Sequence, residues 1–137
     1  MIPTLAEFNE ILAAADVAGR EAVSKLTVIP MIVGQAKSLF SNEIDYSKPT
    51  EYVADGVCGF AWINVYAEFK GNTKLGKEER KVLEATGFSK DYDSTKKYSL
   101  WVSDFNQSMQ KKETYARAFA KVLSDNGIDS FAQSRMD

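Results

Sequence analysis

The feature that constrains the fold most is the run 57–66, which reads VCGFAWINVY. It is dense in β-branched and aromatic residues, and these types are enriched in β-strands. The run is apolar on both sides, with Phe60 and Trp62 on one side and Ile63 and Val65 on the other. A strand that is apolar on both faces is typical of the middle of a sheet. The run therefore predicts a central β-strand.

Weaker patterns divide the rest of the chain into alternating helices and strands. A charged helix closed by Gly87 is predicted over 75–85, and another helix over 108–125. Further strands are predicted at 98–102 and 128–132. This alternation favours an α/β fold with a small three-stranded sheet, in the order β-α-β-α-β, covered by helices.

A long amphipathic helix is predicted to precede this sheet. Thr4 and Glu7 form a capping-box pattern at its start. Two explanations of its apolar seam remain open: the helix packs on its own domain, or it pairs with a second copy and makes a homo-oligomer. The seam has helical 3-4 spacing and consists of Leu5, Phe8, Leu12, Ala15, Gly19, Ala22 and Leu26.

The chain is predicted to form a single domain over 1–137, because that length suits one hydrophobic core. Within it, 1–27 carries the N-terminal helix, 28–56 an irregular connector and 57–137 the β-α-β-α-β core. Inside the connector, the apolar stretch 31–40 is predicted as a short strand or helix, and the remainder from 42 onwards as loop.

Two residue counts limit the chemistry. The chain has no histidine, and Cys58 is its only cysteine. Ser-His-Asp and Cys-His catalysis are therefore excluded, as are zinc sites that need histidine or four cysteines. We expect a non-enzymatic protein with no metal site and no cofactor. Because Cys58 lies at the start of the central strand, we expect it to be buried and reduced.

Charge and hydropathy indicate a cytoplasmic protein. The net charge is −2, from 17 basic and 19 acidic residues, which argues against broad nucleic-acid binding or membrane binding driven by charge. A local basic patch remains compatible with this balance. The N-terminus lacks the pattern of a secretion signal, and no apolar window is long enough to span a membrane. We therefore expect a reducing cytoplasm.

The start of the helix over 108–125 is the first candidate site. Ser108 suits the N-cap position, and free backbone N–H groups beside Gln107 resemble an anion site. Lys111 precedes Tyr115 by four residues and so lies on the apolar side of the helix. A lysine there must snorkel, pair or bind something. Snorkelling is the simpler explanation, and ligand binding is the functional one.

Arg135, close to the C-terminus, is predicted to join this site, with a frayed tail as the alternative. A right-handed crossover makes the last strand parallel to the strand at 98–102 and sets the two side by side. Arg135 then lies at the same edge as Ser108, where parallel strands end and ligands bind. The guanidinium suits phosphate or carboxylate, and Trp101 or Tyr115 offers a stacking surface.

The aromatic residues of the predicted strands allow two explanations. An exposed aromatic sheet with lysines nearby stacks bases in nucleic-acid-binding proteins. Buried strands are also rich in aromatic residues, and this core explanation is favoured. The residues concerned are Phe60, Trp62, Tyr98, Trp101 and Phe105.

Three segments carry a resemblance to known proteins: GFAW at 59–62, QSMQKKE at 107–113 and SRMD at 134–137. Together with most of the chain, they resemble a family of small proteins encoded by tailed bacteriophages. The chain departs from the family pattern at 132–133, where Ala-Gln stands in place of Ala-Gly. The resemblance carries no activity over, but it implies a phage accessory protein that acts in the host cytoplasm with a counter-defence role.

Small phage proteins of this type often bind host proteins or sequester signalling nucleotides. Our first hypothesis is a binding protein for a small anionic ligand or nucleotide. The alternatives are a protein-interaction module that inhibits a host factor, and a minor virion or structural protein. The predicted ligand-binding residues are Trp101, Gln107, Ser108, Lys111, Tyr115 and Arg135.

Overall fold

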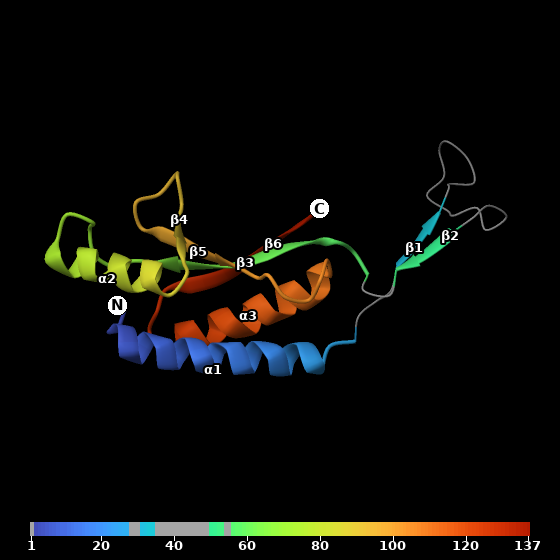
Figure 1. The fold of residues 1–137 in the computed structure, drawn as a ribbon, viewed down its shortest axis with the longest axis horizontal. Coiled ribbons are helices and arrows are strands. Elements are labelled where there is room, and N and C mark those ends of the chain that lie inside the picture. Colours follow the sequence, from blue (N-terminus) through green and yellow to red (C-terminus); the bar gives the residue numbers. More distant parts are fainter. Residues whose placement is uncertain (1, 28–30, 35–49, 54–55) are drawn as a thin grey trace.

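The computed structural model of the protein describes residues 2–27, 31–34, 50–53 and 56–137. Figure 1 shows how the elements in these ranges are arranged. In chain order they are α1 (Leu5–Ser24), β1 (Met31–Gly34), β2 (Thr50–Val53), β3 (Gly59–Tyr66), α2 (Lys74–Ala85), β4 (Ser89–Lys90), β5 (Lys97–Trp101), α3 (Met109–Asp125) and β6 (Ser130–Met136).

A four-stranded antiparallel sheet forms the centre of the fold. Its strand order is β4-β5-β3-β6, so β3 has a neighbour on each side, as its sequence predicts. Ile63 of β3 lies opposite Leu100 of β5 and Ala132 of β6. The strands β1 and β2 pair with each other in a separate two-stranded ladder.

The sheet corrects the prediction in two respects. It has a fourth strand, β4, whose two residues Ser89 and Lys90 are too few and too polar to show a strand pattern. In addition, β6 pairs with β3 and not with β5, so the pairing is antiparallel. The strands β5 and β6 still point the same way, because both are antiparallel to the strand between them. From β3 to β6 the succession is β-α-β-β-α-β, a split β-α-β arrangement.

The predicted connector 28–56 is partly regular. The described part of its apolar stretch forms β1, which is one of the two outcomes predicted there. The strand β2 lies where loop was predicted, and this prediction is wrong. Four residues are too short a run for alternation to distinguish a strand from a loop. The rest of the predicted element, 35–40, and the loop residues 42–49 and 54–55 lie outside the described residues.

The helix ends follow their local sequence signals. Thr4 Oγ1 accepts a hydrogen bond from the backbone N–H of Glu7 at 3.4 Å, and Ser108 Oγ accepts one from that of Lys111 at the same distance. Gly87 follows α2 with a φ of 96°, the left-handed conformation that ends helices. The last strand is longer than predicted and runs to Met136, so the C-terminal segment is paired and not frayed.

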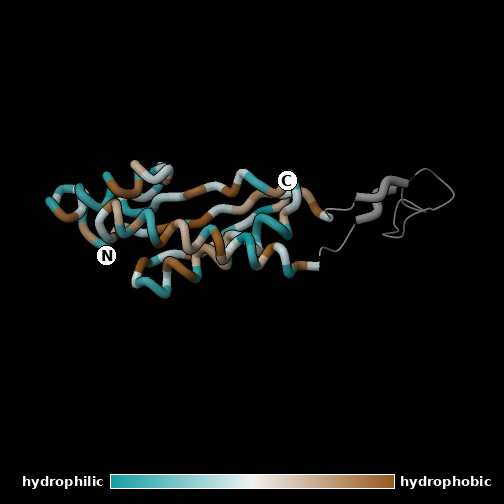
Figure 2. The backbone as a smooth tube through the Cα atoms, turned by 60° about the horizontal axis from the view of Figure 1, so that its bottom comes forward, coloured by the Kyte–Doolittle hydropathy of each residue, from teal (hydrophilic) through white to brown (hydrophobic). Residues whose placement is uncertain are grey.

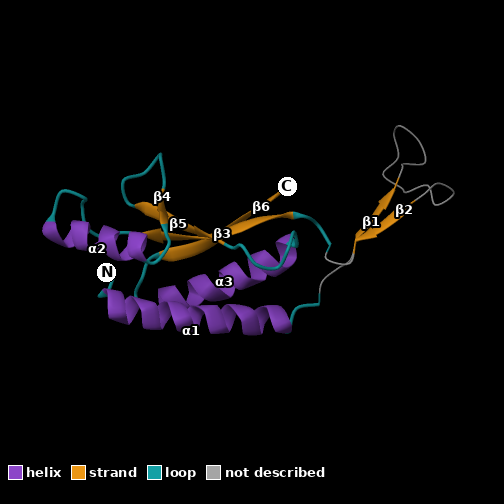
Figure 3. Ribbon diagram, viewed as in Figure 1, coloured by secondary structure: helices purple, strands orange, loops and turns teal. Residues whose placement is uncertain are grey.

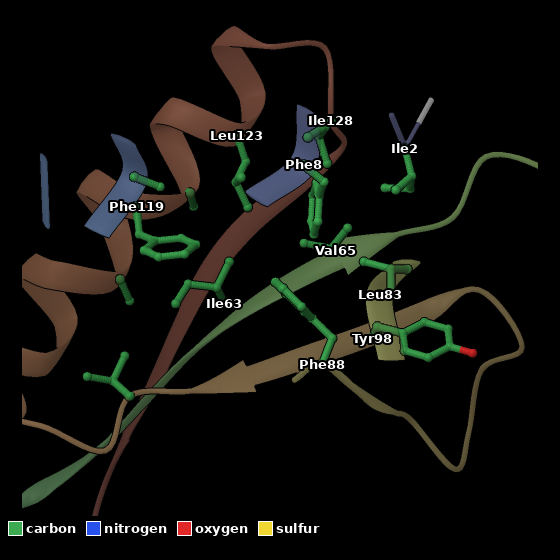
Figure 4. Packing of buried hydrophobic residues seen from close by; sticks show 14 of the residues in the cluster. Ile2, Phe8, Ile63, Val65, Leu83, Phe88, Tyr98, Phe119, Leu123 and Ile128 are labelled. Atoms are coloured by element: carbon green, nitrogen blue, oxygen red, sulfur yellow. The ribbon is translucent and has the colours of Figure 1, made fainter. Parts of the chain in front are cut away.

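All three helices contribute to one core on one face of the sheet. Figure 3 shows α1 and α3 together on that side, and Leu83 brings α2 into the same cluster. On β3, Ala61, Ile63 and Val65 are fully buried. Figure 4 shows Phe8 of α1 above Val65, among side chains from the helices. The alternation of β3 therefore turns its odd-numbered residues toward the helices.

The helix α1 packs within its own domain. Phe8, Ala15 and Gly19 of the predicted seam are buried, and α1 lies along α3. A Cβ atom at Gly19 would come within 2.5 Å of the ring of Tyr115, so the two helices are in close contact there. These seam positions therefore lie against the same chain. Self-association of the protein stays a prediction.

The helices carry polar residues along their lengths. Among the described residues, no helix is long and apolar enough to cross a membrane. Figure 2 shows hydrophilic positions interspersed with hydrophobic ones along each helix. This pattern fits helices with one apolar side turned to a core.

Candidate functional site

The face of the sheet away from the helices is the main candidate site. The even-numbered residues of β3 point to this side, because the odd-numbered ones are buried against the helices. No helix in the described part of the chain lies over it in Figure 3. We call this side the open face. Strand alternation and register assign to it Phe60, Trp62, Asn64 and Tyr66 of β3, Lys97, Ser99 and Trp101 of β5, and Phe131, Gln133 and Arg135 of β6.

The core explanation of the aromatic residues is therefore wrong for most of them. Tyr98 does belong to the core, where it is 1% exposed. In contrast, Phe60 and Trp62 are half-buried and Trp101 is 48% exposed. Phe105 is half-buried beside Tyr115 on the helix side. The strand sequence is apolar on both faces, and it does not say which face the helices cover.

A stacked pair of tryptophans dominates one end of the open face. Trp62 and Trp101 are opposite each other in the β3–β5 register, with ring centroids 4.7 Å apart and planes inclined by 22°. Phe60 meets Trp101 edge-on, at 5.9 Å and 70°. This offset stacking and edge-to-face contact are the favourable geometries for aromatic pairs. Of the three rings, that of Trp101 is the most exposed, at 48%.

Two cations lie beside this cluster. The guanidinium carbon of Arg135 is 5.5 Å from the Phe60 ring centroid and 5.9 Å from that of Trp101. Lys112 Nζ, from α3, is 5.7 Å from the Phe60 centroid. All three distances are in the range of cation–π attraction. We call Phe60, Trp62, Trp101 and Arg135 the tryptophan corner.

A polar group occupies the middle of the open face. Asn64 is completely buried, and its amide is hydrogen-bonded on both sides. Ser99 Oγ donates to Asn64 Oδ1 at 2.9 Å, and Asn64 Nδ2 donates to Gln133 Oε1 at 3.1 Å. These bonds satisfy an amide that would be costly to bury alone. They also fix the exposed Gln133 at the centre of the face.

A second ring pair lies at the far end of the open face. The rings of Tyr66 and Phe131 are 5.9 Å apart and inclined by 20°, and Phe131 is 40% exposed. Lys97 is the register partner of Tyr66 and forms an ion pair with Asp91 at 3.0 Å. The pKa of the Asp91 carboxyl is lowered by the backbone N–H of Asp93 and by Lys97.

The open face is hollowed beside the two tryptophans, on the side of β5 and β4. A depression of about 440 Å³ is lined by residues of the face and by the segment 89–92 after α2. Its volume is in the range of small-ligand sites, although the depression is open to solvent. The residues of the face that line it are Trp62, Lys97, Ser99, Trp101 and Gln133.

Of the predicted site residues, Trp101 and Arg135 come together at the tryptophan corner. Arg135 also lies at the same end of the sheet as the start of α3, as predicted. A Cβ atom at Gly59 would touch both the Arg135 carbonyl and Met109. The route differs from the predicted one, because β6 reaches this end as the antiparallel partner of β3.

Ser108 and Gln107 hold the start of α3 to β3. Ser108 is 1% exposed and forms a β-bridge with Cys58, while the Gln107 carbonyl accepts a hydrogen bond from Gly59 N at 3.0 Å. Met109 N donates to the Val57 carbonyl. Three of the backbone N–H groups expected to hold an anion, those of Ser108, Met109 and Lys111, are thus bonded within the protein. The Ser108 hydroxyl caps α3 by accepting the hydrogen bond from Lys111 N.

Tyr115 and Lys111 do not join the tryptophan corner in the described contacts. The Tyr115 hydroxyl donates to Asp16 on α1, and burial, followed by this bond, raises its pKa. Arg20 bridges Asp16 and Asp104 beside it. Lys111 is half-buried and has contacts of its own.

The buried lysine of α3 is Lys112, at 6% exposure, and not Lys111 as the apolar periodicity indicates. A shift of one position rotates the inferred helix face by about 100°. Cys58 also differs from expectation: it is a free thiol but is half-buried, because β3 begins only at Gly59 and Cys58 lies at the junction with Ser108.

Sequence reasoning missed the second ring pair and the central polar group. Phe131 lies in an alternating segment, so its side could have been assigned by counting from Arg135. Nothing in the linear sequence indicates that Phe131 contacts Tyr66, since β3 and β6 are far apart along the chain.

No family model, curated protein or solved structure significantly matches the chain. Within the described ranges, no group of three cysteine, aspartate or glutamate residues is placed to hold a metal ion. The site is therefore defined by its geometry: an antiparallel sheet face that no described helix covers, with two ring pairs, a polar centre and a guanidinium.

Proposed function

We propose that the open face binds a small anionic ligand that carries a flat ring, most simply a nucleotide. The observation that carries the proposal is Arg135 held beside Trp101 and Phe60. A base stacks on an exposed indole, and a guanidinium forms paired hydrogen bonds to phosphate. At the tryptophan corner these two groups are close enough to engage the two ends of one nucleotide.

The architecture supports a binding role by analogy. RNA-recognition motifs use one face of a four-stranded sheet, with aromatic side chains that stack two or three bases. Here β3 and β5 are the two central strands and carry Trp62 and Trp101.

We propose binding without catalysis. The polar side chains at the centre of the open face bond to each other through amides and a hydroxyl, which are not general bases near neutral pH. The resemblance to phage accessory proteins supports sequestration of a signalling nucleotide in the host cytoplasm, as a counter-defence activity.

A second function, inhibition of a host protein, is favoured by a different observation. β6 is an edge strand, and it exposes Phe131 and Met136, the latter at 67%. An edge strand with apolar side chains suits strand addition by a partner. In that case a strand of the partner would pair along β6, and the protein would show no preference for nucleotides.

Titration with mononucleotides tests the proposal, with quenching of tryptophan fluorescence as the signal. Trp101→Ala and Arg135→Ala should each weaken binding about tenfold or more, equivalent to about 1.4 kcal/mol. Arg117→Ala is the matched control, because Arg117 is an exposed arginine on α3. An affinity that is unchanged in both corner variants, or no binding at millimolar nucleotide, would contradict the proposal.

A further inference from the structure

We infer that the open face accepts nucleotides as part of a single-stranded nucleic acid, with at least two bases stacked on the sheet. This rests on the proposed function and specifies its ligand class. The observation is that the open face has two separate ring pairs. Trp62 stacks on Trp101, and Tyr66 stacks on Phe131. Trp62 and Tyr66 are four residues apart on one strand, a separation of about 13 Å. One base cannot stack on both.

The polar group between the ring pairs suits the edge of a base. Gln133 Oε1 accepts from the buried Asn64, which leaves the amino group of Gln133 for a ligand. Ser99 donates a hydrogen bond to the other end of the Asn64 amide. The hydrogen bonds from Ser99 to Asn64 and from Asn64 to Gln133 therefore hold the Gln133 amide in a fixed orientation. An oligonucleotide that spans both ring pairs passes over this polar group and can hydrogen-bond to it. A single nucleotide stacked on one ring pair does not have to contact it.

Each ring pair also has a cation near it. Arg135 lies beside the tryptophan corner, and Lys97 is the register partner of Tyr66. Lys97 is partly neutralised by Asp91, so its attraction to phosphate is the weaker of the two. The chain as a whole is slightly acidic, which argues against coating of nucleic acid by charge. Binding should therefore depend on base stacking more than on phosphates.

The aromatic rings of the open face should distinguish single strands from duplexes. Bases inside a duplex are stacked on each other and cannot reach side chains on a sheet, whereas unpaired bases can be laid on aromatic rings. With one or two phosphates neutralised, the slope of log K against log salt should lie between about −0.7 and −1.4. A surface that binds through charge alone would show a steeper slope.

The experiment is a length series of fluorescently labelled oligouridylates and oligothymidylates of one, two, four and eight nucleotides, with an eight-base-pair duplex for comparison. Binding is measured by fluorescence anisotropy with the full chain. We expect the affinity to rise at least tenfold between one and four nucleotides, and the duplex to bind more weakly than the single strand of equal length. The two sugar series report whether RNA or DNA is preferred.

Variants at the two ring pairs separate this inference from the proposed function. Phe131→Ala should weaken tetranucleotide binding about tenfold and leave mononucleotide binding unchanged, whereas Trp101→Ala should weaken both. Phe131→Leu keeps an apolar side chain without a ring and should behave like Phe131→Ala, which guards against a loss of folding. Leu75→Ala, at an exposed site on α2, is the control.

The inference is overturned if the tetranucleotide binds no tighter than the mononucleotide, if Phe131→Ala has no effect on it, or if the duplex binds as well as the single strand. In those cases the proposed nucleotide site still stands if mononucleotides bind through the tryptophan corner. If neither mononucleotides nor oligonucleotides bind, both the inference and the proposed function fail, and a protein partner becomes the better explanation of the open face.

Discussion

Replacing Gly19 with alanine should destabilise the protein, although alanine is the better helix former. Helix propensity alone predicts a gain of about 1 kcal/mol in the free energy of unfolding. However, the new Cβ would lie 2.5 and 2.7 Å from two ring carbons of Tyr115. The ring is held by a hydrogen bond to Asp16 and by contacts with Phe105 and Phe119. Overpacking of this kind costs about 1–3 kcal/mol, so we expect a net loss of up to about 2 kcal/mol.

Urea unfolding followed by circular dichroism measures this change. Ala14→Gly is the control, since Ala14 is exposed on the same helix, and it should lose only the propensity of about 1 kcal/mol. If Gly19→Ala gains as much stability as Ala14→Gly loses, α1 does not lie against Tyr115 in solution. The seam of α1 would then be available for pairing with a second copy of the chain.

Two further predictions concern buried polar contacts. Glu79→Gln should lower the free energy of unfolding by about 1–3 kcal/mol. The Glu79 carboxylate is 3% exposed and accepts hydrogen bonds from three backbone N–H groups, including that of Ile2, and a glutamine would leave at least one of them unpaired. An unchanged Tm in thermal unfolding would refute this. Tyr115→Phe should be most destabilising between about pH 4 and pH 10. The Tyr115 hydrogen bond lowers the pKa of Asp16 from 3.8, so the stability that this bond contributes is lost as the pH falls below 3.8. Burial raises the pKa of Tyr115 from 10.0, so the stability that the neutral hydroxyl contributes is lost as the pH rises above 10.0. A difference in unfolding free energy that is constant from pH 2 to pH 11 would contradict the assignment.

Local signals in the sequence were sufficient for the helices and for the central strand. The caps at Thr4 and Ser108 and the glycine after α2 mark the helix ends, because each satisfies backbone groups within a few residues. The apolar run of β3 predicted a strand with neighbours on both sides, and the structure confirms it. These features depend on short-range geometry, which a linear pattern records directly.

The open face could not be assigned in the same way. Alternation separates Trp62 from Ile63, but which side the helices cover depends on tertiary packing. The partner of β6 depends likewise on competition between β3 and β5 for the same strand, and the usual crossover rule favoured the wrong one. Among the predicted site residues, only Trp101 and Arg135 meet on this face. They meet because the C-terminal ends of β5 and β6 both lie beside the N-terminal end of β3.

The central claim is that the open face is a stacking surface for nucleotides, and the two tryptophans of the chain report on it directly. Trp62 and Trp101 both lie at the tryptophan corner, so a ¹⁵N-labelled sample should give two indole N–H signals, one from each. On titration with a mononucleotide, we predict that both signals shift together with one dissociation constant. Signals that stay in place at millimolar nucleotide, or that stay while helix-side residues shift, would contradict the claim.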